Sequence, residues 1–286
     1  MRTAVLLTGL QRNSSHFVAN LLGCLIDIND CDVFIYTADD SKVRREVGRE
    51  IRILNMRPDD DFCDEDGLRK RYGEKVKGVK VDRGNAEMNE FMSLLFPDDG
   101  VDVKREKHMS NGRDSHVLEC NKNIVSQFFK VRQAVLMMEE YERANGFKYD
   151  YVLRLRMDSF FGMKVSLDMV AKMYDMRSVA LSPRLANDFK RNNCDSLVFI
   201  KRDYAHILKD FVMFYASRRN YSEIVVPEEE LFLFVEGHGL KMELGKGLGY
   251  RAGSYVGRAR DIPFFRRESI PEINKRMNFY STPFRW

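Results

Sequence analysis

The chain has 286 residues, of which 44% are hydrophobic and 31% charged, and its 47 basic and 43 acidic side chains give a net charge of +4. This composition is typical of a soluble globular protein, excludes low-complexity and collagen-like chains, and is too balanced to indicate nucleic-acid binding. No apolar run is long enough to span a membrane, and the apolar run at the N-terminus is too short for a signal peptide.

The first 56 residues have the pattern of a βαβ unit followed by a third strand. TAVLLTG at 3–9 is almost continuously apolar, which indicates a strand buried on both faces, and CDVFIYT at 31–37 has the same character. Between them, Ser14 or Ser15 can cap a helix whose apolar residues recur at helical spacing. The two strands should therefore be parallel. EIRILNM at 50–56 is the predicted third strand.

The middle of the chain is predicted to hold two helices separated by a loop. An acidic loop follows the third strand, and a helix is expected around 86–96. Residues 98–122 are polar and without period, which predicts a mobile loop. Residues 123–145 have the clearest helical pattern, with a stop at Asn145-Gly146.

The second half of the chain alternates predicted strands and helices. The expected strands lie at 149–161, 178–182, 195–201 and 240–244, and the expected helices at 203–218 and from Pro227 to Gly239. Together with the first half, this order predicts one α/β domain with a mostly parallel sheet flanked by helices.

The predicted strand at 149–161 has a polar face. Alternation along the strand places Arg154, Arg156 and Asp158 together, opposite its aliphatic residues. Unpaired charges are too costly to bury, so this face must be paired or must open into a cleft. Ligands of open α/β sheets lie at the carboxyl ends of the strands, where Asp158 falls, and there a carboxylate can hold a divalent cation and an arginine a diphosphate. The alternative is a structural Arg–Asp pair that joins the sheet to a helix.

Several stretches together resemble the GT-A type glycosyltransferases, which use nucleotide sugars. VLLTGLQR and NDCDVFIYT are similar to the first two strands of this family, and residues 126–161 resemble its central helix and the strand after it. NNCDSLVFIKRDYA and VPEEELFLFVEGHGL are similar to its later acceptor-side elements. The resemblance covers residues 3–244 and implies a GT-A (Rossmann-like) domain at 1–249. Its nucleotide-binding half is expected at 1–97 and its metal and acceptor half at 123–249. A basic aromatic tail, packed on the domain, is expected at 250–286.

The resemblance also implies a metal site. An acidic motif after a central strand of this family binds Mn²⁺ or Mg²⁺, which bridges the diphosphate of the donor. Asp158 matches the last acidic position of that motif, whereas Arg156 stands at the first, so one carboxylate and an arginine could hold the diphosphate with a weak metal or none. Asp59 and Asp61 form a rival Asp-x-Asp, or else a solvated acidic loop. His238 is implied as a second metal ligand, with a helix cap as its alternative role.

The nucleotide of a UDP- or GDP-sugar is expected at the carboxyl ends of the first strands. Gly9 allows close approach to the backbone and Arg12 can meet a phosphate, although an ordinary strand-to-helix turn would also explain them. The predicted donor-binding residues are Thr8, Gly9, Gln11, Arg12, Thr37, Asp39, Arg154, Arg156 and Asp158.

An inverting transfer also needs a general base. The candidates are Asp195, Glu228 and Glu229, with Glu230 beside them; the glutamates could equally complement a helix dipole.

The predicted activity is hexosyl or pentosyl transfer from a nucleotide sugar to a hydroxyl of a glycan or glycoprotein acceptor. The alternatives are an inactive nucleotide- or glycan-binding module of the same fold and, from the basic tail, an RNA-binding protein.

The five cysteines are scattered and never in C-x-x-C spacing. They favour reduced thiols in the cytoplasm over a disulfide or zinc framework. Neither a transmembrane segment nor a nucleic-acid partner is expected.

Overall fold

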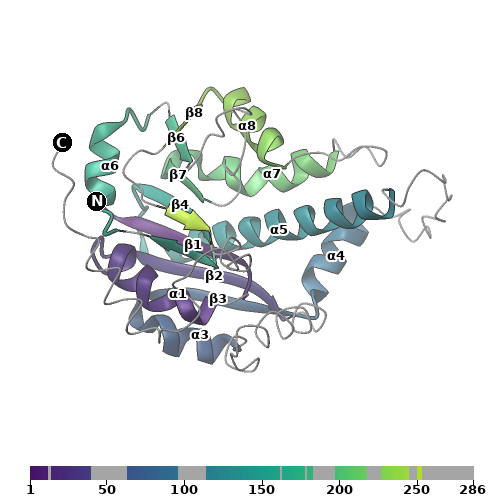
Figure 1. The fold of residues 1–286 in the computed structure, drawn as a ribbon, viewed down its shortest axis with the longest axis horizontal. Coiled ribbons are helices and arrows are strands. Elements are labelled where there is room, and N and C mark those ends of the chain that lie inside the picture. Colours follow the sequence, from purple (N-terminus) through teal and green to yellow (C-terminus); the bar gives the residue numbers. More distant parts are fainter. Residues whose placement is uncertain are drawn as a thin grey trace, which may run out of the picture.

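A computed structural model describes residues 1–11, 14–39, 63–95, 114–161, 163–177, 179–182, 197–217, 227–244 and 250–252. Figure 1 shows how the strands and helices of these residues are arranged. The strands are β1 (Thr3–Leu10), β2 (Asp32–Asp39), β3 (Val76–Arg83), β4 (Tyr151–Arg156), β5 (Ser159–Phe161), β6 (Val179–Ser182), β7 (Leu197–Lys201), β8 (Lys241–Leu244) and β9 (Tyr250–Ala252). The α-helices are α1 (Ser14–Leu21), α3 (Glu65–Tyr72), α4 (Ala86–Leu95), α5 (Asp114–Asn145), α6 (Leu167–Met173), α7 (Ala205–Ser217) and α8 (Pro227–Gly237), with short non-α turns at η1 (Leu22–Ile26), η3 (Gly73–Lys75) and η5 (Arg202–Tyr204).

Seven of the described strands form one sheet in the order β3-β2-β1-β4-β7-β6-β8. The ladders β3–β2, β2–β1, β1–β4 and β6–β8 are parallel, and β7 runs antiparallel to both of its neighbours. All of these strands except β7 therefore point the same way. The predicted α/β class, with a mostly parallel sheet flanked by helices, is confirmed.

The chain changes direction across the sheet at β1. β2 and β3 lie on one side of β1, and β4 lies directly on its other side. The β1–β4 ladder ends with Thr8 opposite Arg156, at the carboxyl end of both strands. In open α/β sheets such a switch point is where ligands bind, because the loops leaving the two strands diverge and open a crevice.

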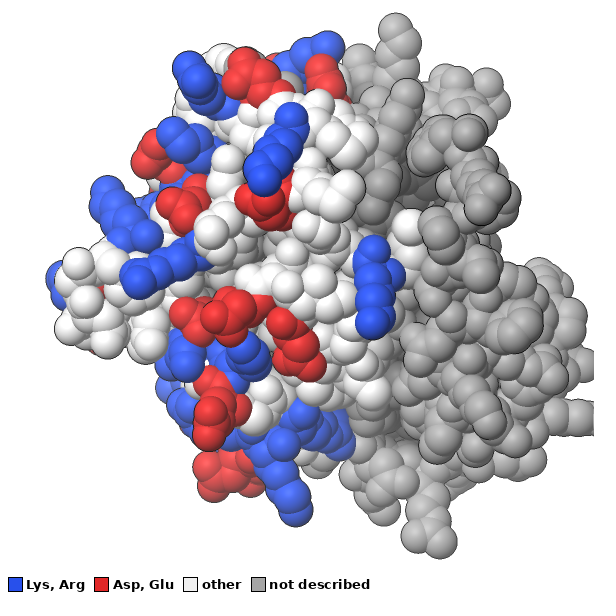
Figure 2. Space-filling model, turned by 90° about the vertical axis from the view of Figure 1, so that its left-hand side faces the viewer, with Lys and Arg blue, Asp and Glu red and all other residues white. Residues whose placement is uncertain are grey.

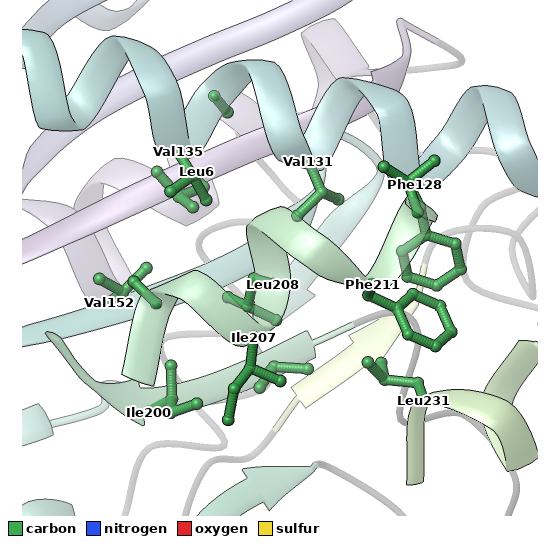
Figure 3. Close-up of a cluster of buried hydrophobic side chains, with 14 of the residues drawn as sticks. Leu6, Phe128, Val131, Val135, Val152, Ile200, Ile207, Leu208, Phe211 and Leu231 are labelled. Atoms are coloured by element: carbon green, nitrogen blue, oxygen red, sulfur yellow. The ribbon is translucent and has the colours of Figure 1, made fainter. Parts of the chain in front are cut away.

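The sheet is covered on both faces. Helices α5, α7 and α8 cover one face, and their apolar side chains pack on residues such as Leu6 and Val152 (Figure 3). Helices α1, α3 and α6 cover the other face, where Val5 and Leu7 are fully buried. Alternation along β1 explains this division, since neighbouring residues point to opposite faces. Each fully buried aliphatic side chain of this kind contributes about 1.5–3 kcal/mol to stability.

Two asparagines of the first βα unit hold the segment that follows β4. Asn20 donates to the Phe161 carbonyl at 2.9 Å and accepts from the Phe161 amide at 2.7 Å. Asn29 donates to the Val165 carbonyl at 2.8 Å and accepts from the Leu167 amide at 2.7 Å. These side-chain hydrogen bonds hold β5 beside α1 and the start of α6 beside the turn that follows η1.

The structure differs from the sequence prediction in several elements. β3, α3, α6 and β9 were not expected, and the single strand predicted at 149–161 is divided into β4 and β5. α5 starts at Asp114, so part of the expected loop at 98–122 is helix. A helix nucleated by its packed turns continues through polar residues, because each added residue gains a hydrogen bond. The predicted strand at 50–56 lies outside the described residues, as do Asp59 and Asp61.

No helix within the described part of the chain has the length and apolar character that crossing a membrane requires.

Candidate functional site

The end of β1 brings a glycine to the switch point. Gly9 has φ = +114°, a conformation that side-chain-bearing residues rarely adopt, and a Cβ added there would meet no atom within 4 Å. Thr37 Oγ1 donates to the Gly9 carbonyl at 2.8 Å and so fixes the end of β1 to β2. The backbone at the predicted nucleotide position is thus open to close approach. Thr37 itself is fully buried and engaged with the protein.

Thr8 is also fully buried, one step before Gly9. Its hydroxyl has no hydrogen-bond partner among the described residues. A buried hydroxyl of this kind is costly unless it finds a partner. Thr8 therefore remains a candidate for contact with a ligand, directly opposite Arg156 in the ladder.

Gln11 has a structural contact in place of the predicted ligand contact. Its side-chain nitrogen donates to the Cys63 carbonyl at 2.8 Å, and its oxygen accepts from the Cys63 amide at 2.9 Å. Gln11 is only 1% exposed. Its amide is therefore used to hold the chain entering α3 against the end of β1, which the sequence pattern did not indicate.

Arg156 and Asp158 form a bidentate ion pair. Arg156 Nε lies 2.9 Å from Asp158 Oδ1, and Nη2 lies 2.8 Å from Oδ2. β4 ends at Arg156, and the following turn stays attached to β1 through the Met157 amide, which donates to the Thr8 carbonyl at 3.3 Å. Asp158 therefore lies in a turn beside the strand end, and not on the strand face as predicted. The Asp158 side chain is 6% exposed and that of Arg156 is 24% exposed, so the guanidinium is the accessible member of the pair.

Arg154 lies deeper in the sheet. It pairs in register with Leu6 of β1 and Val198 of β7 and is only 1% exposed. It shares the face of the sheet that α5 and α7 cover. A ligand at the strand ends would meet Arg156 before Arg154.

The described residues do not fit a metal centre at Asp158. Both carboxylate oxygens are taken by Arg156, and within the described ranges no group of three or more His, Cys, Asp or Glu could hold an ion. His238 follows α8 and precedes β8, which places it at the amino edge of the sheet, opposite the edge where Asp158 lies. The structure therefore does not bring His238 to Asp158, and the predicted metal pair does not form.

Other acids at this edge are engaged by the protein itself. Asp82, at the end of β3, is 1% exposed and accepts from the amides of Glu87 and Met88 at 3.0 and 3.1 Å, so it caps α4. Glu87 accepts from the Tyr36 hydroxyl at 2.7 Å and pairs with Lys80 at 3.0 Å. The hydrogen bond from Tyr36 lowers the pKa of Glu87 below its ordinary value, with a further lowering by Lys80. Neither acid was singled out in the sequence, because Asp82 and Glu87 are five residues apart and a capping box needs a spacing of three.

The predicted acceptor-side acids belong to elements that begin at the same edge as Asp158. β7 is reversed, so its first residue, Leu197, pairs with Leu155 near the carboxyl end of β4. α8 leads into β8, which runs parallel to β6, so the first turn of α8 also lies toward the carboxyl edge. Of the predicted residues, Glu228 and Glu229 lie in that turn with side chains outside the described part, whereas Arg12, Asp195 and the side chain of Asp39 are not described.

β9 brings a late part of the chain to the same place. β5 and β9 form a separate antiparallel pair in which Ser159 lies opposite Ala252 and Phe161 opposite Tyr250. Because β5 directly follows Asp158, the first three residues of the predicted basic tail lie beside the Arg156–Asp158 turn, with Ala252 opposite the residue that follows Asp158. This pairing could not be predicted, because a strand of three residues is too short to show an alternating hydrophobic pattern.

Figure 2 shows the side of the molecule where the N-terminus and α6 lie in Figure 1. Among the described residues on this face, basic and acidic side chains are interspersed, and neither sign forms a continuous patch.

No family model and no curated protein matches the chain. Among solved structures, the chain is similar to mouse xyloside xylosyltransferase 1 in its apo form, with 11% identity, a TM-score of 0.37, and 85% of each chain covered. It is also similar to a nucleoside-diphosphate-sugar pyrophosphorylase from Vibrio cholerae, with 8% identity, a TM-score of 0.43, and 94% of this chain and 100% of the other covered. Likenesses this distant carry no argument about function.

Proposed function

We propose that this chain binds a nucleoside-diphosphate sugar at the β1–β4 switch point and transfers its sugar to a hydroxyl of a glycan or glycoprotein acceptor. The observation that carries the proposal is the partly exposed Arg156 guanidinium, held at the end of β4 directly opposite Thr8 and beside the open backbone of Gly9. A fixed guanidinium next to an accessible backbone suits the oxygens of a diphosphate.

In this proposal Arg156 stabilises the departing nucleoside diphosphate. Negative charge accumulates on the diphosphate as the bond to the anomeric carbon breaks, and a cation already in position lowers the barrier. Asp158 orients the guanidinium through its two hydrogen bonds. The fully buried Thr8 hydroxyl would donate to a phosphate oxygen only after the residues that cover it moved.

In this proposal the predicted Mn²⁺ or Mg²⁺ is an alternative to Arg156 as the partner of the Asp158 carboxylate. Asp158 could ligate an ion only after its carboxylate parted from Arg156, and an ion there would supply further positive charge to the diphosphate. Guanidinium and metal thus compete for the same carboxylate. This competition makes the two roles separable by experiment.

The acceptor hydroxyl would approach from the side of β7 and α8. For an inverting transfer, Asp195, Glu228 or Glu229 removes the proton from the hydroxyl, the oxygen attacks the anomeric carbon, and the nucleoside diphosphate leaves with the electron pair. The support for this assignment is topological: the reversed β7 and the first turn of α8 both start at the carboxyl edge.

The test is calorimetric titration of the full chain with UDP and GDP, each with Mn²⁺ and with EDTA. Arg156→Lys keeps the charge but loses the paired donors, and we expect it to weaken binding about tenfold or more. Arg202→Lys is the matched control, because Arg202 makes the equivalent pair with Glu142 at the opposite edge. Its affinity should equal that of the unaltered chain. Equal affinities of the Arg156→Lys variant and the control would refute the proposed site.

The Asp158→Asn variant shows whether the Arg156 guanidinium or a metal ion neutralises the diphosphate. If Arg156 neutralises the diphosphate, binding persists in EDTA and Asp158→Asn changes it only modestly. If Asp158 ligates an ion, binding depends on Mn²⁺ and Asp158→Asn abolishes that dependence. The closed Arg156–Asp158 pair favours the first result.

The same closed pair also supports a second candidate, an inactive nucleotide- or glycan-binding module. Such a module would bind the nucleotide sugar without hydrolysing or transferring it. Product analysis by mass spectrometry, with Asp195→Asn, Glu228→Gln and Glu229→Gln as inactivating changes, separates the module from the transferase.

A further inference from the structure

Two histidines meet at the amino edge of the sheet, away from the switch point. His206 lies in the first turn of α7, and His238 directly follows α8. Both side chains are exposed, and their ring centroids are 5.8 Å apart with an interplanar angle of 62°. The sequence separation of the two residues gives no hint of this contact.

Backbone contacts fix the same tautomer in both neutral rings. His206 Nδ1 lies 3.0 Å from the Asp203 carbonyl oxygen, and His238 Nδ1 lies 2.8 Å from the Phe234 carbonyl oxygen. A carbonyl oxygen can only accept, so Nδ1 carries the proton in each ring and donates it. The lone pair of each neutral imidazole is therefore on Nε2. Histidines that bind metals in proteins have this arrangement, with one ring nitrogen donating to a carbonyl and the other ligating.

The spacing of the rings suits a shared ion. An ion about 2.1 Å from Nε2 lies about 3.2 Å from the ring centroid, so two imidazoles on one ion have centroids roughly 4.5–5.6 Å apart at ligand angles of about 90–120°. The observed 5.8 Å is slightly wider than this range, and a small rotation of the exposed His206 ring brings the two rings into it. The His238 ring also packs edge-on against Phe234, with centroids 4.4 Å apart, which restricts its rotation.

We propose that His206 and His238 together bind one first-row transition-metal ion, such as Ni²⁺, Zn²⁺ or Cu²⁺, with water completing the coordination shell. Neutral imidazole nitrogens prefer these ions over Mg²⁺ and Ca²⁺, which take oxygen ligands. The ion would link the start of α7 to the end of α8. This site is independent of the proposed nucleotide site, because it lies at the opposite edge of the sheet.

The experiment uses the full chain without an affinity tag. Calorimetric titration with Ni²⁺ should show one equivalent bound, and His206→Gln and His238→Gln should each weaken it about tenfold or more. Excess Mg²⁺ should not compete. His116→Gln is the matched control and should bind Ni²⁺ as tightly as the unaltered chain. Because both rings are exposed, the two variants should retain the melting temperature of the metal-free protein.

A second measurement tests the link between the helices. Ni²⁺ should raise the melting temperature of the unaltered chain and of His116→Gln, and should not raise that of His206→Gln or His238→Gln. Absence of binding, or binding that both histidine variants retain in full, would overturn the proposal. UDP affinity should be the same with and without Ni²⁺, which keeps this test separate from that of the nucleotide site.

Discussion

Two arginines make similar ion pairs at opposite edges of the sheet, yet differ in what they offer to a ligand. Arg202 holds Glu142 through contacts of 2.8 and 2.5 Å, and Glu142 also accepts from the Tyr149 amide at 2.9 Å. The Arg202 side chain is 12% exposed and that of Glu142 5%. This pair is shielded from solvent and links α5 to the residues just before β4 and just after β7. Arg156, at 24%, is twice as exposed as Arg202, which makes its guanidinium the more accessible of the two.

Gly9 gives a residue-scale prediction. Gly9→Ala places a side chain where φ = +114°, which costs about 1–3 kcal/mol in backbone strain even though the space is empty. Urea unfolding of the two proteins measures the loss. Gly23→Ala is the control, because a Cβ there also meets nothing within 4 Å and no positive φ is required. A neutral or stabilising effect of Gly9→Ala would show that the strained conformation is absent in solution.

At the element scale, the sequence predicted the elements whose patterns are set by burial. β1, β2 and β7 are apolar runs buried on both faces, and α7 and the end of α5 follow the predicted helical periods. β3 was missed because it lies at the edge of the sheet and carries Lys77 and Lys80, which protect an edge but break the apolar pattern. α3 was missed because its acidic start resembles a loop; Asp64 in fact caps it through the Gly67 amide.

The asparagine contacts give an element-scale prediction. Asn20→Ala removes two buried hydrogen bonds to the backbone of Phe161, so we expect a loss of about 1–3 kcal/mol in the free energy of unfolding. Asn145→Ala is the matched control: its single bond to the Tyr141 carbonyl is exposed, and its loss should cost less than about 1 kcal/mol. Chemical denaturation of both variants measures the difference. Equal losses would mean that the Asn20 contacts do not hold β5.

At the scale of the whole molecule, the sequence could place the strand ends but not the contacts between them. The βαβ pattern and the polar end of β4 predicted the edge where Thr8 and Arg156 meet, because parallel strands end together. The reciprocal bonds of Gln11 with Cys63, and the wide separation of His238 from Asp158, depend on long-range packing. Such contacts leave no local signal in a single sequence.

Hydrogen exchange gives the prediction at this scale. β1 and β4 lie at the centre of the sheet with a strand on each side, whereas β8 has a described partner on one side only. The amides of β1 and β4 should therefore exchange only through global unfolding, and those of β8 through smaller openings as well. Mass spectrometry of the exchanging chain, resolved by peptide, measures both. Equal protection of β8 and β1 would show that the outer edge is covered.

The short ladder between β5 and β9 has a practical consequence for anyone who shortens this chain. Ser159–Phe161 and Tyr250–Ala252 are the two members of that ladder, so a truncation before Tyr250 takes away the strand beside β5. Loss of activity after such a cut would not by itself implicate the removed side chains, since the turn that presents Arg156 would have lost a support. Cutting after Ala252 keeps the ladder and gives the cleaner comparison.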